Sequence, residues 1–285
     1  MRWRGRRQSE NVVDRRGVSG GKVVGGGFGL IILVIVVTLL GGDPRALLQQ
    51  VPNQVAVNPG AGGGGGELSA LDRERGEFVA TVLADTEDVW NQLFRQSGLM
   101  YEEPKLELFS RQTRSGCGLA SSASGPFYCP IDRTIYLDTA FFDQLDQQLG
   151  APGDFAQAYV IAHEVGHHVQ KLLGKLDEVQ RLRGRLSETE YNRYSVMLEL
   201  QADFYAGVMF HHAENQKRIL EAGDIEEGLR AAAAIGDDTL QERSQGYADQ
   251  ESFTHGTSDQ RVRWFMKGLQ TGDPAQGDTF SAASL

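Results

Sequence analysis

The stretch Ala162–His167, with the sequence AHEVGH, decides what kind of domain this chain forms. It has the spacing H-E-x-x-H, and residues four apart on an α-helix lie on one face. His163 and His167 can therefore present imidazole nitrogens to a single metal ion. Apolar residues recur at helical spacing around the motif, and they favour a packed helix over a solvated one with two surface histidines. Glu164 follows the first histidine, where a carboxylate can take a proton from zinc-bound water.

The third metal ligand is expected downstream, on a second helix. Glu199 and Asp203 are the only acidic residues in a long apolar helical pattern, and they are four apart. Buried carboxylates require partners, because an unpaired buried charge is costly. We expect Glu199 to bind the zinc ion and Asp203 to accept the second N–H of a ligating imidazole. The alternative is a structural ion pair with an arginine such as Arg261 or Arg263.

These motifs resemble known families. The combination of H-E-x-x-H and E-x-x-x-D resembles the gluzincins, the thermolysin-like proteases in which a Glu is the third zinc ligand. The whole chain resembles the bacterial putative neutral zinc metallopeptidase family in its Arg-rich start, one membrane span and the stretches Cys117–Gly118, Gly125–Pro130, His163–His168, Glu199–Asp203 and Phe253–Ser258. The resemblance implies one zinc ion per chain, bound by His163, His167 and Glu199. It also implies that Glu164 is the general base and that Asp203 orients His163.

The N-terminal part predicts a membrane anchor. Residues 1–22 hold seven basic and two acidic side chains, a net charge of +5, and residues 23–42 carry no charge. About 20 apolar residues span a bilayer, and the basic flank is expected to stay in the cytoplasm. We expect a single-pass protein of the inner (cell) membrane, with residues 1–22 as a cytoplasmic arm and the catalytic domain periplasmic or extracellular. A cleaved signal peptide is the competing interpretation.

The remaining chain divides into a linker, one domain and a tail. Residues 43–68 are rich in Gly and Pro and predict a tether, residues 69–272 have the length of one domain, and residues 273–285 are expected to be flexible. The fold class is α+β, mostly helical and zincin-like, with a small sheet from short strands near residues 106–109 and 134–137. A further helix is expected from Thr257, with Gln260 at capping-box spacing. In gluzincins an edge strand of the sheet holds the substrate, and residues 127–128 or 134–137 are the candidates here.

Cys117 and Cys129 are the only cysteines, and both lie in the domain expected to be exported. A pair of cysteines in an oxidising compartment favours a disulfide that closes a short loop. Metal binding by both and a pair of free buried thiols remain as alternatives.

A hydrogen-bond donor is also needed opposite the metal, where negative charge develops on the substrate oxygen. His255, in a polar stretch before the last helix, is our candidate for this catalytic role. A surface or capping role is the alternative for a histidine in a loop.

The motifs together predict a membrane-anchored, zinc-dependent endopeptidase that hydrolyses peptide bonds by Glu-assisted attack of zinc-bound water. Its partners would be a peptide or protein substrate and the membrane. The chain has a net charge of −10, so the part after the arm carries −15, which disfavours nucleic-acid binding. The alternative is a catalytically weak, zinc-protease-like module for binding or assembly at the membrane. The intact Glu164 argues against it.

Overall fold

The computed structural model describes residues 1–17 and 67–285. The expected membrane span at residues 23–42 lies outside the described residues, as does the expected linker except for its last two positions. None of the helices within 1–17 and 67–285 is both long enough and apolar enough to cross a membrane. The fold is α+β and mainly helical with a small sheet, which confirms this part of the expected fold class.

One four-stranded sheet contains both strands that the sequence predicts. The strands are β1 (Val12–Asp14), β2 (Lys105–Phe109), β5 (Phe127–Cys129) and β6 (Thr134–Asp138), and their order in the sheet is β1-β2-β6-β5. β1, β2 and β6 run parallel, whereas β5 is antiparallel to β6 and lies at the edge. A separate hairpin is formed by β3 (Gln112–Ser115) and β4 (Gly118–Ser121).

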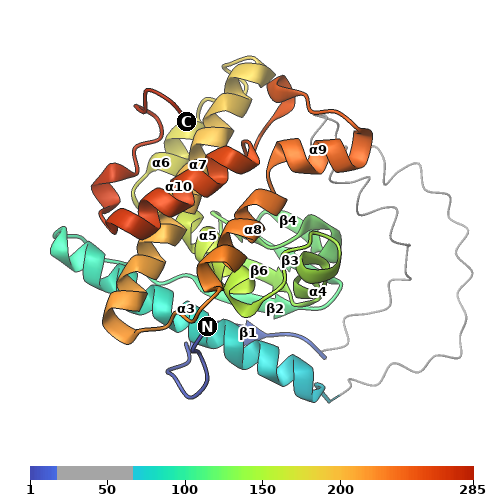
Figure 1. Cartoon of the computed structure of the whole chain (residues 1–285), viewed down its shortest axis with the longest axis vertical. Coiled ribbons are helices and arrows are strands. Elements are labelled where there is room, and N and C mark those ends of the chain that lie inside the picture. The colour runs from blue at the N-terminus through green and yellow to red at the C-terminus, as the bar shows by residue number, and fades with distance from the viewer. Residues whose placement is uncertain (18–66) are drawn as a thin grey trace, which may run out of the picture.

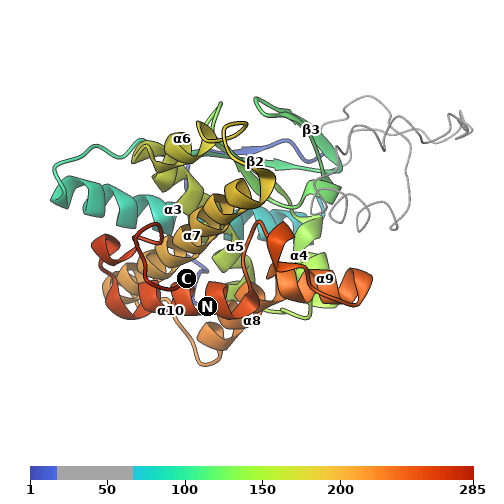
Figure 2. The same cartoon turned by 90° about the horizontal axis from the view of Figure 1, so that it is seen from above.

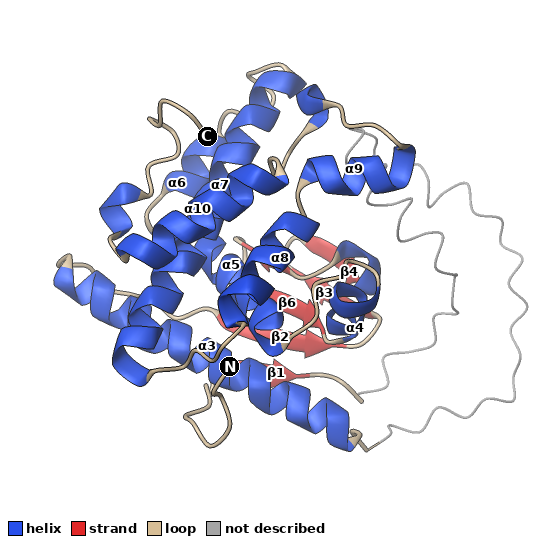
Figure 3. Ribbon diagram, in the orientation of Figure 1, coloured by secondary structure: helices blue, strands red, loops and turns tan. Residues whose placement is uncertain are grey.

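The helices form the rest of the domain (Figures 1 and 3). They are α3 (Ala70–Gln96), α4 (Ala140–Gln147), α5 (Asp154–Leu172), α6 (Lys175–Gln180), α7 (Glu188–Lys217), α8 (Asp224–Ala234), α9 (Asp237–Gln245) and α10 (Ser258–Thr271), with short 3-10 turns η1 (Ser122–Ser124), η2 (Gln250–Ser252) and η3 (Pro274–Gln276). The expected capping box at Thr257 and Gln260 does begin α10. Figure 2 shows the sheet on one side, α8, α9 and α10 on the other, and α5 and α7 between them.

Glycines allow the central helices to approach closely. A Cβ atom at Gly207 of α7 would lie 2.2 Å from the carbonyl oxygen of Phe265 on α10. A Cβ atom at Gly268 of α10 would lie 2.0 Å from the carbonyl oxygen of Phe204. Real Cβ atoms do not come this close to backbone oxygen, so both positions require glycine. The resulting backbone contact fixes α10 against the helix that carries Glu199.

Both ends of the described chain pack against the domain. Residues 1–16, which belong to the cytoplasmic arm expected at residues 1–22, contribute the edge strand β1 and bury Trp3 against Phe78 of α3. The tail expected to be flexible is also ordered. Thr279 donates from Oγ1 to the carbonyl oxygen of Met197 at 2.7 Å, and Thr279 is buried. The differences arise because each segment finds polar and apolar partners that lie far away in the sequence.

The disulfide between Cys117 and Cys129 is confirmed, with the two Cα atoms 5.8 Å apart. It joins the turn between β3 and β4 to the last residue of β5. No described cysteine is free, so metal binding by the cysteines and free thiols are both excluded in this structure. The bond fixes the β3–β4 hairpin beside the edge strand of the main sheet.

Candidate metal centre

Two buried helices face each other at the site that the sequence predicts. α5 carries His163, Glu164 and His167, and α7 carries Glu199. The helices can approach because Gly166 has no side chain at the contact. A Cβ atom there would lie only 2.8 Å from the carbonyl oxygen of Ala202. α5 therefore carries two of the candidate ligands, and its Gly166 leaves room for α7 to bring the third one close.

The structure brings the three expected ligands together. The Nε2 atom of His163 lies 3.1 Å from Oε2 of Glu199, and the Nε2 atom of His167 lies 3.4 Å from Oε1 of the same carboxylate. One donor atom from each of the three residues lies within 4.8 Å of the other two. A tetrahedral zinc site with bonds of about 2.0–2.1 Å has edges of roughly 3.3–3.4 Å. The donor types and their spacing therefore fit a zinc ion.

Asp203 orients His163 and pairs with an arginine at the same time. Its Oδ1 atom lies 2.8 Å from Nδ1 of His163, and its Oδ2 atom accepts a hydrogen bond of 2.8 Å from Nε of Arg261. Tyr159 also donates its hydroxyl to Asp203. The sequence offered an orienting role and an ion pair as alternatives, and the geometry combines the two. With the Nδ1 proton directed at Asp203, the Nε2 lone pair of His163 faces Glu199 and the metal position.

His167 has an orienting partner that sequence reasoning missed. Its Nδ1 atom lies 2.9 Å from Oε1 of Gln170, which is fully buried. The amide of Gln170 donates to the carbonyl oxygen of Leu198 at 2.7 Å and to Oε1 of Gln201 at 3.2 Å. Gln201 in turn donates to the carbonyl oxygen of Gly277 at 2.7 Å. A chain of buried amides thus connects His167 to the C-terminal segment. The only sequence signal was a polar residue three positions after a candidate ligand.

The charged groups of the centre favour a bound cation. Burial opposes ionisation of Glu199, but His167 and His163 lower the pKa of its carboxyl well below the usual value. Burial likewise opposes protonation of His163, yet the carboxylates of Asp203 and Glu199 raise its pKa to about 10. Burial raises the pKa of Glu164, so this carboxyl binds a proton more strongly than an exposed one. A cation position with a basic carboxylate beside it is the arrangement that metal-assisted hydrolysis requires.

His255 lies in the loop before α10, and Asp237 at the start of α9 fixes it. One carboxylate oxygen of Asp237 accepts hydrogen bonds from the main-chain N–H groups of Thr254, His255 and Gly256, at 2.7, 2.6 and 3.0 Å. The other oxygen lies 3.1 Å from Nδ1 of His255. The positive charge of His255 also helps to lower the pKa of the Glu199 carboxyl. Asp237 was missed because only the folded chain brings it to the loop.

The edge strand β5 is attached to the metal helix by His168. The Nδ1 atom of His168 accepts a hydrogen bond from the Tyr128 hydroxyl at 2.9 Å, and its Nε2 atom donates to the carbonyl oxygen of Glu102 at 2.6 Å. Burial lowers the pKa of this imidazole to about 4, so it stays neutral. The main chain of Tyr128 also lies against the carboxyl of Glu164. The free edge of β5 is therefore held next to the candidate base.

Comparison with known proteins decides the family. The chain matches the family described as "Putative neutral zinc metallopeptidase" over residues 1–280. The chain belongs to this family. It is 49% identical to the uncharacterized protein YpfJ of Escherichia coli (strain K12), over 98% of this chain and 99% of that protein. It is 42% identical to the uncharacterized protein Rv2575 of Mycobacterium tuberculosis (strain H37Rv), over 87% of this chain and 86% of that protein. No solved structure matches the chain.

Membership of this family implies zinc and a hydrolase by the family's description. The relatives named above are uncharacterized, so the roles of individual residues follow from the geometry alone. A second group of carboxylates, Asp154, Asp224 and Glu227, also has the spacing of a metal site. In this structure the amino group of Met1 already lies among them, 2.5 Å from Oδ1 of Asp154 and 3.3 Å from Oδ1 of Asp224. The centre on α5 and α7 is therefore the candidate for zinc.

Proposed function

We propose that this protein is a zinc-dependent endopeptidase with one metal ion per chain. The observation that carries the proposal is the meeting of His163, His167 and Glu199 at tetrahedral spacing, with Glu164 on the same helix turn. A structural zinc site is closed by four protein ligands, whereas a catalytic site has three and keeps one position for water or substrate. Three ligands beside a basic carboxylate therefore support hydrolysis over a purely structural role.

A zinc ion held by these three residues would supply a Lewis acid that acidifies water and polarises the substrate carbonyl. Glu164 then accepts a proton from the attacking water and passes it to the nitrogen of the leaving amine. His255, held by Asp237, donates a hydrogen bond to the carbonyl oxygen as negative charge develops there. Asp203 and Gln170 keep the imidazoles of His163 and His167 in the ligating tautomer.

The substrate is proposed to be an extended peptide that adds to the edge of β5. Of the two candidate strands, β6 lies between β2 and β5 in the sheet, so its main-chain groups already have partners on both sides. β5 pairs only with β6 in the described sheet, and its other edge can pair with an added strand. Main-chain pairing to β5 would place a peptide bond near Glu164, because the main chain of Tyr128 lies against that carboxyl.

The test compares peptide hydrolysis by zinc-loaded wild type and Glu164→Gln, with mass spectrometry of the products from a mixed peptide library. Glu178→Gln is the matched control, because Glu178 is an exposed glutamate on the neighbouring helix α6. We expect wild type and Glu178→Gln to produce the same cleavages and Glu164→Gln to lose them while it keeps its zinc. Equal cleavage by Glu164→Gln would refute the proposed mechanism. Zinc binding without cleavage by any variant would favour the binding or assembly module.

A further inference from the structure

Residues 1–16, called the arm below, pack against the domain along two elements. Figure 1 shows the arm beside α3. Its strand β1 pairs in parallel with β2, with Val12, Val13 and Asp14 opposite Leu106, Glu107 and Leu108. Main-chain hydrogen bonds continue outside the strand, from the N–H of Ser9 to the carbonyl oxygen of Ala80 at 2.9 Å and from the N–H of Arg2 to that of Ile219 at 2.8 Å. The arm is therefore bound through its backbone along its length.

The charges of the arm are matched by acidic residues on α3. Arg6 forms an ion pair with Asp85, and Arg7 binds Glu87 at 3.0 Å and Asp88 at 2.7 Å. Asp85 and Glu87 are both only 2% exposed. Without the arm, Asp85 would keep Lys217 at 2.8 Å, but Glu87 would lose Arg7, Ser9 and Asn11, which are all on the arm. A buried charge without partners is costly. The positive charge that predicted a cytoplasmic location thus has partners within the domain.

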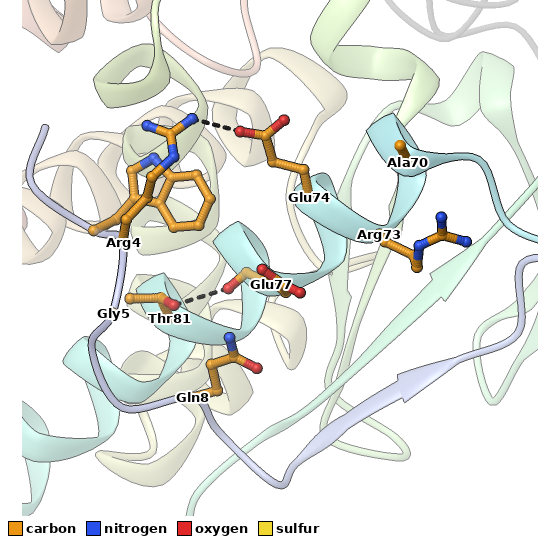
Figure 4. A pocket seen from close by; sticks show the side chains of 9 residues that line it. Arg4, Gly5, Gln8, Ala70, Arg73, Glu74, Glu77 and Thr81 are labelled. Carbon is orange, nitrogen blue, oxygen red and sulfur yellow. Dashed lines mark hydrogen bonds and ion pairs between the residues drawn. The ribbon is translucent and has the colours of Figure 1, made fainter.

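Aromatic and polar contacts hold the first residues of the arm. Trp3 is buried and packs edge-on against Phe78, with the ring centroids 5.4 Å apart. Arg4 and Glu74 form an ion pair beside a pocket between the arm and α3 (Figure 4). The volume of this pocket is about 440 Å³. The guanidinium of Arg4 also lies 4.6 Å from the centroid of the Trp3 ring. These contacts make the arm part of the domain's surface and core.

We propose that the arm is a permanent part of the folded domain, docked in cis, so that Gly17 and Glu67 lie on the same side of any membrane the protein meets. A single crossing by residues 23–42 would place the arm and the rest of the domain on opposite sides. β1 could not then pair with β2, and Asp85 and Glu87 would lose their arginines. The docked arm therefore excludes the single-pass topology expected from the sequence.

Cysteine labelling in sealed membranes tests the proposal with the full chain. Glu10 on the arm and Met100 on the domain are exposed, and each is replaced by cysteine in a separate variant. Because the two native cysteines are joined, each variant has one free thiol. Spheroplasts are treated with a membrane-impermeant maleimide before and after detergent permeabilisation. We expect the two variants to label under the same conditions. Labelling of one in sealed spheroplasts and of the other only after permeabilisation would overturn the proposal.

A cross-strand disulfide tests the docking itself. Val13→Cys with Glu107→Cys places two thiols on facing residues of neighbouring strands, whose Cα atoms lie about 5 Å apart. Val13→Cys with Lys105→Cys is the matched control, because Lys105 lies two residues before Glu107 on the same strand and is roughly 8 Å away. We expect an intramolecular cross-link in the first pair only, seen as a monomer with altered mobility before reduction. A linked dimer, or no cross-link, would refute docking in cis. Neither test depends on peptidase activity.

Discussion

Arg261 and Asp203 form a buried ion pair, with Nε of the arginine 2.8 Å from Oδ2 of the carboxylate. The other oxygen of Asp203 faces Nδ1 of His163 at 2.8 Å. The guanidinium thus gives Asp203 a charge partner that does not depend on the protonation of His163. α10 takes part in ligand orientation through this arginine, although it provides no ligand itself.

Replacing Asp203 should lower the free energy of unfolding more than replacing a residue that only orients a ligand. Asp203→Ala removes the carboxylate from a fully buried arginine, and breaking such a pair typically costs about 3–5 kcal/mol. Urea unfolding of the metal-free protein measures this loss. Arg261→Met is the variant of the other partner, because it removes the guanidinium and leaves an aliphatic side chain at the position. If Asp203→Ala unfolds at the same urea concentration as wild type, the ion pair has no structural role.

Zinc retention should distinguish the residues that bind zinc from the residue that orients one of them. Glu199→Ala should weaken zinc binding as strongly as His163→Ala, because each removes a donor atom from the site. Asp203→Asn should lower affinity less, by about 10- to 100-fold, since it leaves all three donor atoms in place and changes only the partner that His163 and Arg261 share. Zinc content after dialysis against graded chelator concentrations gives the order. Full zinc retention by Glu199→Ala would rule out the gluzincin-like ligand set.

The chain of buried amides predicts that Gln170, which is not a candidate ligand, affects the zinc affinity. Gln170→Leu should reduce zinc affinity by about 10- to 100-fold, because the Nδ1 proton of His167 loses its acceptor. Gln216→Leu, at an exposed glutamine of α7, is the control and should bind zinc like wild type. Competition with a fluorescent chelator measures both. Equal affinities would show that the helix backbone alone orients His167.

His255 should act on the rate of hydrolysis and leave the metal in place. His255→Ala is expected to lower kcat by about 10²- to 10³-fold, as the loss of one oxyanion donor does, with a small change in KM. Asp237→Asn should reduce kcat as well, because Asp237 fixes the main chain of the loop that carries His255. Steady-state kinetics on one peptide, with zinc content measured in parallel, separates this effect from metal loss.

The disulfide should be present without added oxidant. Cys117 and Cys129 are expected not to react with iodoacetamide in the native protein before reduction. Replacing both with serine should lower the free energy of unfolding by about 3 kcal/mol, the chain-entropy value for a loop of this length. Two alkylated thiols in the freshly isolated protein would contradict the bond.

Short-range patterns predicted which residues the fold brings together at the candidate metal centre. His163 and His167 are placed by the four-residue spacing of one helix, and Glu199 and Asp203 by the same spacing on another. The disulfide was expected because both cysteines lie in the domain predicted to be exported, and two cysteines allow only one pair. The ligand spacing depends on local helix geometry, which the sequence contains directly.

What the sequence did not predict depends on contacts between distant segments. Asp237 reaches His255 only after α9 and α10 have packed, and the partners of Arg6 and Arg7 lie about 80 residues away. A run of arginines has the same composition whether it flanks a membrane or binds an acidic helix. The tail at Gly277 likewise gives no local sign that it accepts a hydrogen bond from α7.

The pairing of β1 with β2 has a consequence for synthesis of the chain. Val13 and its partner Glu107 are separated by 94 residues. Ribosomes add roughly 5–20 residues per second, so the first strand waits on the order of 5–20 s for its partner to be made. Arg15, next to that strand, waits equally long for its ion-pair partner Glu107. Arg6 and Arg7 find their partners on α3, which is made earlier. The first strand of the sheet to be made therefore stays without its neighbour until β2 has been synthesised.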